Sequence, residues 1–329
     1  MVYTAVQQFQ EMIIDLPTGD DFKFSGIDFL NIAWNIVIGV LEPLQEATES
    51  ETEYYVWENG EIIDTYFLLT EELVKEYWKK AQRQISTALI LIQQGTELLL
   101  KGHIATVDPY LLISSNLAIY SEVTDGCDIR FSDLKTIDAR ELIKVYNTVS
   151  DVPLPEDFQR RFEALRSKRN IVMHSVNLNS YIRLTDLLVQ VLEVFYHLAS
   201  PGSWLDTRKS FIENMPGSLL WEPEAIRQFD YIKDILATEV DLVFNFLQPS
   251  EVRKHFGFEK KQRRYVCPYC YGTSFRECYS RGGSDEHIPR LAQLSPNEPG
   301  SVSVYCLVCS ETSLVFRDSL RWTPKVGQF

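Results

Sequence analysis

The chain has 329 residues, of which 45% are hydrophobic and 12% aromatic, and its formal net charge is −14. These values are typical of a folded globular protein with two or three domains, and they exclude a disordered or low-complexity chain. The longest apolar stretch, residues 32–41, is shorter than the about 20 residues that span a bilayer. The first residues lack a basic segment followed by an apolar core, so we expect no secretory signal. We therefore expect a cytoplasmic protein with no membrane partner.

The charge is unevenly distributed. Residues 1–250 carry 20 Lys and Arg against 38 Asp and Glu, whereas residues 251–329 carry 12 against 8. Nucleic-acid affinity depends largely on contacts between cations and phosphates, so RNA binding would need a local basic site. The acidic N-terminal region has two interpretations, a solvated surface or a nucleic-acid mimic that covers a basic cleft or a basic partner.

The N-terminal half begins with a predicted hairpin and a long helix. Asn59-Gly60 lies between two runs of aromatic and β-branched residues, which predicts a hairpin with a type I′ turn. The amphipathic pattern from Thr70 then predicts a helix of about thirty residues that ends at Gly102.

Further helices follow along the chain. We expect helices over residues 138–149, from Pro155 through the segment EDFQRRFEALRSKRNIVMHSV, over about 180–199 and over about 223–247, with an ordered loop at 200–223. The predicted fold is mainly α, with an up-and-down helical bundle. Three segments are predicted: a small mixed α/β acidic region (1–70), the bundle (71–248) and a β-rich C-terminal domain (249–329).

The helix after Pro155 carries an arginine where an apolar residue is expected. Phe158, Phe162 and Leu165 form an apolar stripe with Val172 and Val176, and Arg169 falls on that stripe. Arg166, Asn170 and His174 line up at i, i+4 and i+8 on an adjoining face. Alone, Arg169 fits a snorkelling side chain or an ion pair, and His174 fits a surface histidine. Together they break the binary pattern in a way that marks functional sites.

The segment LRSKRNIVMHS is similar to the RNxxxH form of the R-x4-6-H motif of the HEPN family, helical domains that include many endoribonucleases of prokaryotic defence and toxin systems. The preceding segment GTELLLKGHI, with Glu97 and Lys101, resembles the first long HEPN helix. The resemblance covers roughly residues 71–200. It implies a metal-independent endoribonuclease that uses the RNA 2′-OH as nucleophile and leaves 2′,3′-cyclic phosphate ends.

The same resemblance implies roles and partners. His174 would act as general acid or base, Arg169 would hold the phosphate, and Asn170 would orient either group. Arg166, Glu97 and Lys101 would support this site. Two such domains usually face each other across a dimer, so we expect a homodimer. A regulatory protein or inhibitor is a further expected partner.

Two CxxC pairs, Cys267/Cys270 and Cys306/Cys309, stand near the C-terminus. Four thiolates from two such turns predict one structural Zn²⁺ in a zinc ribbon, with no catalytic metal. Two redox pairs are the alternative, but no βαβ pattern surrounds them. Cys278 and His287 lie between the pairs and are substitute ligands.

A basic run precedes the first CxxC pair: Lys260, Lys261, Arg263 and Arg264. Its aromatic neighbours include Phe256, Phe258, Tyr265, Tyr269 and Tyr271, so we interpret the run either as an RNA-docking face or as a solvated linker. Two other readings of the whole chain stay open. One is a catalytically silent nucleic-acid-binding or regulatory adaptor, and the other is an assembly protein in which Arg169 and His174 only stabilise a dimer.

Overall fold

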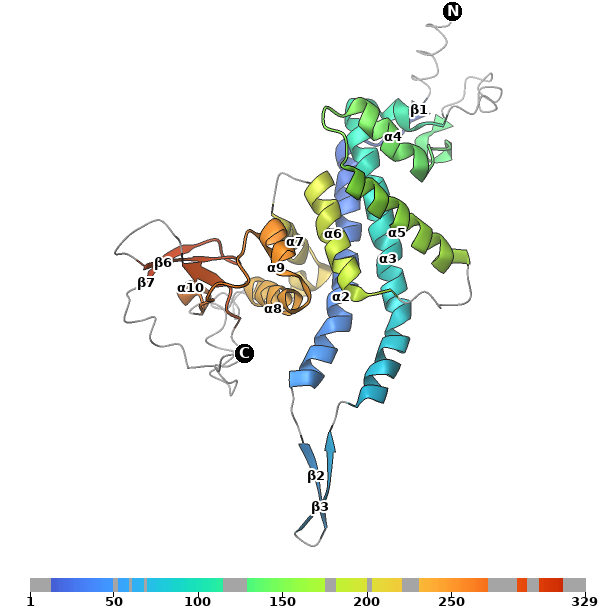
Figure 1. Ribbon diagram of the computed structural model, residues 1–329. Helices are drawn as coiled ribbons and strands as arrows, with labels where there is room; N and C mark the ends of the chain where they lie inside the picture. Colours follow the sequence, from blue (N-terminus) through green and yellow to red (C-terminus); the bar gives the residue numbers. More distant parts are fainter. Residues whose placement is uncertain are drawn as a thin grey trace, which may run out of the picture. The chain divides into compact units, whose positions relative to one another are not determined.

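The protein is mainly helical, with a few short strands (Figure 1). The structure is a computed structural model, and it describes residues 13–49, 53–58, 61–67, 70–114, 129–174, 182–199, 203–220, 231–271, 289–294 and 302–315. Its residues group into two compact units. Unit 1 comprises residues 1–37 and 77–201, and unit 2 comprises residues 38–76 and 202–329. The predicted division into three segments stays a prediction.

Two long helices, α2 (Gly19–Glu49) and α3 (Glu71–Val107), lie side by side over the residues that belong to unit 1, 19–37 and 77–107 (Figure 1). A methyl group on Gly26 would lie 2.9 Å from the carbonyl oxygen of Gly95, and one on Gly95 would lie 2.9 Å from the carbonyl oxygen of Gly26. Gly19 and Gly102 form a second such pair, two turns away along each helix. The two helices therefore touch through their backbones at the glycines.

This packing corrects the predicted end of the long helix. Gly102 does not end α3, which continues to Val107. A methyl group at Gly102 would lie 2.8 Å from the carbonyl oxygen of Gly19, so this glycine permits a close helix–helix approach instead of a turn. The interior Gly95 has the same explanation.

Three more helices complete unit 1. Helix α4 (Ala139–Val149) is capped by Asp138, whose carboxylate accepts a hydrogen bond from the amide of Arg140 at 2.7 Å. Helix α5 (Glu156–His174) carries the Arg–His motif, and α6 (Leu184–Leu198) is buried along most of its length. Strand β1 (Ile13–Ile14) pairs in parallel with β4 (Ile129–Arg130), and 3₁₀ turns cover Pro109–Leu112 and Phe131–Asp133.

Unit 2 contains a helix in the segment predicted as a loop. Helix α7 (Trp204–Glu213) begins after Ser203, whose hydroxyl accepts a hydrogen bond from the amide of Leu205 at 3.1 Å. The buried positions of this helix have a helical period, with Trp204, Arg208 and Ile212 at i, i+4 and i+8. The Pro and Gly residues around it obscure this pattern in the sequence. A 3₁₀ turn follows at Pro216–Leu220.

Three further helices and two small sheets also belong to the described part of unit 2. Helix α8 (Tyr231–Phe246) is followed by α9 (Pro249–Phe256), which ends at Gly257 with φ of 63°. The predicted hairpin is confirmed as antiparallel β2 (Glu53–Glu58) and β3 (Glu61–Phe67), and its Asn59-Gly60 turn lies outside the described residues. Near the C-terminus, β5 (Ala292–Leu294), β6 (Val302–Cys306) and β7 (Thr312–Val315) form an antiparallel sheet in that order, and the short helix α10 spans Pro268–Cys270.

Helix α2 is also long and apolar enough to cross a membrane by length and composition. An 18-residue window within Gly19–Thr48 has a mean hydropathy of 1.6, and half of that window is buried inside the protein. Among the described residues it is the single helix with this property, and the core helix of a soluble protein passes the same test. The finding therefore does not show a membrane protein, and the cytoplasmic location stays a prediction.

Candidate functional site

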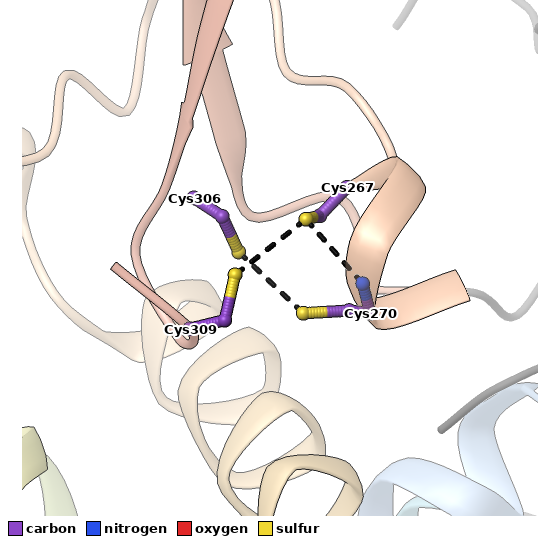
Figure 2. A group of neighbouring side chains, drawn as sticks. All are labelled: Cys267, Cys270, Cys306 and Cys309. Carbon is purple, nitrogen blue, oxygen red and sulfur yellow. Dashed lines mark hydrogen bonds between the residues drawn. The ribbon is translucent and has the colours of Figure 1, made fainter. Parts of the chain in front are cut away.

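The four cysteines of the CxxC pairs form one cluster in unit 2 (Figure 2). Their Sγ atoms all lie within 4.8 Å of one another. Sγ of Cys267 lies 3.7 Å from Sγ of Cys309, and Sγ of Cys270 lies 3.8 Å from Sγ of Cys306. Each of these close contacts joins one CxxC turn to the other, so the cluster ties together segments that are more than thirty residues apart in the sequence.

The spacing of the sulfur atoms fits a tetrahedral metal site. A disulfide would bring two sulfurs to about 2.05 Å, and all four cysteines are free thiols. Around a zinc ion with Zn–S bonds of about 2.3 Å, tetrahedral geometry puts the sulfurs about 3.8 Å apart. The donor set therefore suits zinc. All four ligands would come from the protein, so such a site would leave no position for a substrate.

Local backbone geometry holds the cysteine side chains in place. The amide of Cys270 donates to Sγ of Cys267 at 3.5 Å, and the amide of Ser310 donates to the carbonyl of Cys306 at 3.0 Å. Ser310 adopts a left-handed conformation with φ of 58°, which turns the chain back into β7. Hydrogen bonds among the four sulfurs lower the pKa of Cys267 and raise the pKa of Cys270 and of Cys306. The thiolate is the form that binds a metal.

In unit 1, Arg169 contacts Glu97 across the α3–α5 interface. Phe158, Phe162 and Leu165 bury the apolar face of α5, and Arg169 follows one turn later. Its Nη2 donates to Oε1 of Glu97 at 3.3 Å. The Arg169 side chain stays 31% exposed and that of Glu97 13% exposed. A guanidinium on an apolar stripe thus has an acidic partner and still reaches solvent.

Polar groups of α3 continue this contact in both directions. Nε2 of Gln93 donates to the same Oε1 of Glu97 at 3.0 Å. Gln93 is fully buried, and its Oε1 has no hydrogen-bond partner within the part of the chain that the structure describes. On the other side, Nζ of Lys101 donates to Oγ1 of Thr136 at 3.2 Å, and burial lowers the pKa of Lys101. Gln93, Glu97 and Lys101 form a polar stripe at i, i+4 and i+8, which we call the α3 polar stripe.

The α3 polar stripe includes a residue that the sequence interpretation missed. The sequence predicts Glu97 and Lys101 near Arg169 but makes no prediction for Gln93. The signal for Gln93 is its spacing, since it precedes Glu97 by one helical turn. A buried amide with an unpaired acceptor marks a position where hydrogen bonding is incomplete.

The other residues of the motif lie on a different side of α5. Helix α5 continues to His174, which is exposed as its last residue. Arg169 and His174 are five residues apart, so their side chains leave the helix about 140° from each other and about 7.5 Å apart along its axis. Arg166 donates from Nη2 to Oε2 of Glu163 at 2.8 Å, and Asn170 is half-buried. In one copy of α5, Arg169 therefore contacts Glu97, whereas the His174 side chain leaves the helix on another side.

The basic run before the first CxxC pair is partly used in internal contacts. Nζ of Lys260 donates to the carbonyl of Leu247 at 2.8 Å, and Nη1 of Arg264 lies 3.4 Å from Oδ1 of Asp241. The guanidinium of Arg263 lies over the ring of Tyr265, 5.3 Å from its centre, and Lys261 is exposed. Lys260 and Arg264 thus make polar contacts within the protein and Arg263 makes a cation–π contact, while Lys261 and Arg263 are exposed.

The aromatic neighbours of the basic run divide in the same way, with Phe258 and Tyr265 buried and Tyr269 and Tyr271 exposed. The substitute ligands Cys278 and His287 lie outside the described residues, as does Val176. No family model, curated protein or solved structure matches this chain.

Proposed function

We propose that this chain is a metal-independent endoribonuclease of the HEPN type. The observation that supports it most is the position of Arg169, a partly exposed guanidinium on the apolar face of α5 beside the α3 polar stripe. An arginine held by one carboxylate oxygen keeps further donors for a phosphate. The desolvated Lys101, one turn from Glu97, adds a second cation to the same helix face.

The chemistry follows from these groups. The 2′-oxygen of RNA attacks the adjacent phosphorus, the bond from phosphorus to the 5′-oxygen breaks, and a 2′,3′-cyclic phosphate and a 5′-OH form. A histidine takes the proton from the 2′-OH, and a protonated group returns one to the leaving 5′-oxygen, a contribution of about 10²–10⁴ in rate. Arg169 stabilises the charge on the phosphorane oxygens. Asn170 and Arg166 orient the phosphate or the imidazole.

The directions of Arg169 and His174 favour a composite site in a homodimer. Because the two side chains leave α5 about 140° apart, a second copy of α5 would supply the group that one copy directs away. Pairing would also bring two sets of arginines together, which would offset the net charge of −14 near the substrate. We propose the homodimer as the active form, acting in the cytoplasm as an effector of a prokaryotic defence or toxin system, with a regulatory protein or inhibitor that restrains it.

For unit 2 we propose a zinc ribbon. Cys267, Cys270, Cys306 and Cys309 would hold one structural Zn²⁺ at the end of the β5–β7 sheet. Metal binding would supply folding energy to a module with little core of its own, on the order of 10 kcal/mol. The ribbon would recognise the substrate RNA.

The test is cleavage of RNA by purified protein in excess EDTA. Wild type is expected to leave 2′,3′-cyclic phosphate ends, and His174→Ala and Arg169→Lys are each expected to lose about 10²–10⁴ of the rate. His255→Ala, a substitution of a half-exposed histidine on α9, is the matched control and should cleave as wild type does. Equal cleavage by wild type and His174→Ala would refute the proposal.

One observation favours a catalytically silent adaptor as a second candidate. No hydrogen bond orients the imidazole of His174 among the described residues, and general acid–base catalysis needs a positioned group. An adaptor would bind RNA without cutting it, and His174→Ala would leave that binding unchanged. The same proteins, assayed for binding and for cleavage side by side, separate the two candidates.

A further inference from the structure

The segment from Phe258 to Tyr269, which leads into the first CxxC turn, contacts helix α8 and the residue after it. The four contacts join Lys233 with Tyr269, Asp241 with Arg264, Phe244 with Phe258, and the carbonyl of Leu247 with Lys260. The cysteine cluster holds the other side of the same turn through Cys267 and Cys270. Side chains that project outward from this turn therefore have a rigid support.

Two tyrosines project from this rigid turn into solvent. Tyr269 and Tyr271 flank Cys270, and they are 47% and 38% exposed. Nζ of Lys233 lies 4.9 Å from the centre of the Tyr269 ring. Large exposed aromatic side chains on a fixed backbone carry little conformational entropy to lose on binding, so they suit a ligand with flat faces of its own.

The charge around these tyrosines differs from that of the whole chain. Residues 231–271 hold seven Lys and Arg and five Asp and Glu, a net charge of +2, whereas the whole chain has −14. Two of the acids are paired locally, Glu259 with Arg253 and Asp241 with Arg264. Lys261 and Arg263 remain exposed on the same segment. The segment 231–271 thus combines exposed aromatic rings with positive charge in an otherwise acidic protein.

We infer that Tyr269 and Tyr271, with Lys233, Lys261 and Arg263, form a platform that binds single-stranded RNA by base stacking. Unpaired bases stack on exposed aromatic rings while nearby cations follow the phosphates, and the binding tolerates any sequence. In a duplex the bases are stacked on one another, so their faces cannot stack on such rings. The inference rests on the proposed function in that the ligand is RNA. It adds the tyrosines of the first CxxC turn and Lys233 to the two exposed cations of the Lys260–Arg264 run.

The test measures binding apart from cleavage. Full-length protein carrying His174→Ala is titrated against a fluorescein-labelled single-stranded oligouridine and against a duplex of the same length, with fluorescence anisotropy as the readout. We expect tighter binding of the single strand. Tyr269→Ala with Tyr271→Ala should weaken it by about tenfold or more, whereas Tyr269→Phe with Tyr271→Phe should retain it, because the ring and not the hydroxyl stacks.

Two further variants serve as controls for position and charge. Tyr196→Ala removes an equally exposed tyrosine on α6, 48% exposed, and should bind as the parent does. Lys233→Gln should lower the slope of log affinity against log salt by about 0.7, the amount expected for one phosphate contact to a single strand. Unchanged binding by the double alanine variant, or equal affinity for duplex and single strand, would overturn the platform.

A second measurement uses wild-type protein, so its result does not depend on whether a variant folds. Wild-type protein is crosslinked by ultraviolet light to RNA that contains 4-thiouridine, and the adducts are located by mass spectrometry. Adducts on the peptide that contains Tyr269 and Tyr271 support the platform, and adducts confined to unit 1 overturn it. Cleavage without binding at the tyrosines would refute this inference alone. Binding at the tyrosines without cleavage by wild type would refute the proposed nuclease and leave the platform standing.

Discussion

Each unit of the protein contains an arginine–glutamate pair between two helices, and the two pairs differ in how much water reaches them. In unit 2, Arg208 and Glu239 form a bidentate pair with N–O distances of 2.6 and 3.2 Å, and the arginine side chain is 1% exposed. In unit 1, Arg169 makes one longer contact of 3.3 Å with Glu97 and is 31% exposed. The buried pair is complete within the fold, whereas the half-exposed arginine retains donors that can reach a ligand.

The contrast separates a structural polar group from a candidate functional one. A buried arginine must satisfy its donors inside the protein, since leaving them unpaired costs several kcal/mol. A partly exposed arginine meets water instead and can exchange that water for a phosphate. The cysteine cluster of unit 2 belongs with the structural groups, because all four ligands of the proposed zinc would come from the protein.

The largest expected effect comes from removing one thiol of that cluster. Cys306→Ser should abolish stoichiometric zinc binding and unfold the C-terminal sheet, because three thiolates hold zinc far more weakly than four and the metal supplies on the order of 10 kcal/mol. Zinc content by mass spectrometry and limited proteolysis measure the two consequences. Cys278→Ser is the matched control and should keep one zinc per chain. Loss of zinc in that control would make Cys278 a ligand.

The same variant tests whether the two units depend on each other. The Arg169–Glu97 pair and the α2–α3 glycine contacts all lie within unit 1. We therefore expect the backbone amides of α3 to stay protected from hydrogen exchange in Cys306→Ser. Loss of protection throughout α3 would show that unit 1 needs the cluster of unit 2 for its stability.

The two arginine–glutamate pairs should respond very differently to the same change. Arg208→Met leaves Glu239 charged and buried, so we expect a loss of about 3–5 kcal/mol in the free energy of unfolding. Arg169→Met should cost less, about 1 kcal/mol, because Arg169 is itself partly exposed and Glu97 keeps its hydrogen bond from Gln93. Urea denaturation measures both. Equal losses would mean that Arg169 is a structural residue and would remove the main support for the proposed site.

The glycine contacts of unit 1 give the next effect in size. Gly95→Ala puts a methyl group 2.9 Å from the carbonyl oxygen of Gly26, so the overpacking, at about 1–3 kcal/mol, should outweigh the about 1 kcal/mol gained from helix propensity. Gly39→Ala is the matched control on α2, where the methyl group would meet open space, and it should raise stability by about 0.5–1 kcal/mol. Thermal unfolding shows the two opposite signs. A gain in both variants would contradict the close backbone contact.

The parts of the fold that the sequence predicted are those specified locally. The hairpin around residues 53–67, helix α4 after the Asp138 cap and helix α5 after Pro155 all depend on signals within a few residues of one another. The CxxC pairs are also local, so their meeting at one point required only that two turns face each other. Helix α7 was missed because turn-forming residues flank a period of only three buried positions.

What the sequence could not predict are contacts between distant segments. Gly102 fits a helix end, and its packing against Gly19 is visible only once α2 and α3 lie together. Gln93 is an ordinary polar residue until Glu97 and Arg169 meet beside it. The Lys233–Tyr269 contact joins residues on α8 and the first CxxC turn. Periodicity identifies the face of an element, but the partner of that face depends on the tertiary fold.

The smallest expected effect concerns Lys101 on the α3 polar stripe. Burial lowers the pKa of Lys101 in the folded protein below the ordinary value of 10.5. The charged lysine therefore destabilises the folded state at neutral pH, and this cost disappears as the pH rises through the folded pKa toward 10.5. Lys101→Met removes this cost. It also removes the hydrogen bond to Thr136, so the net gain at pH 7 should stay below about 1 kcal/mol.

The pH dependence distinguishes a desolvated lysine from one that is held favourably. Urea denaturation of wild type and Lys101→Met at pH 7 and pH 10 should show the variant more stable at pH 7 and the difference smaller at pH 10. Lys144→Met, at an exposed position of α4, controls for the loss of one positive charge. A variant less stable than wild type at pH 7 would mean that the contacts of Lys101 with Thr136 and Glu97 outweigh its burial. Lys101 would then belong with Arg208 among the structural polar groups, and Arg169 alone would remain to meet a phosphate.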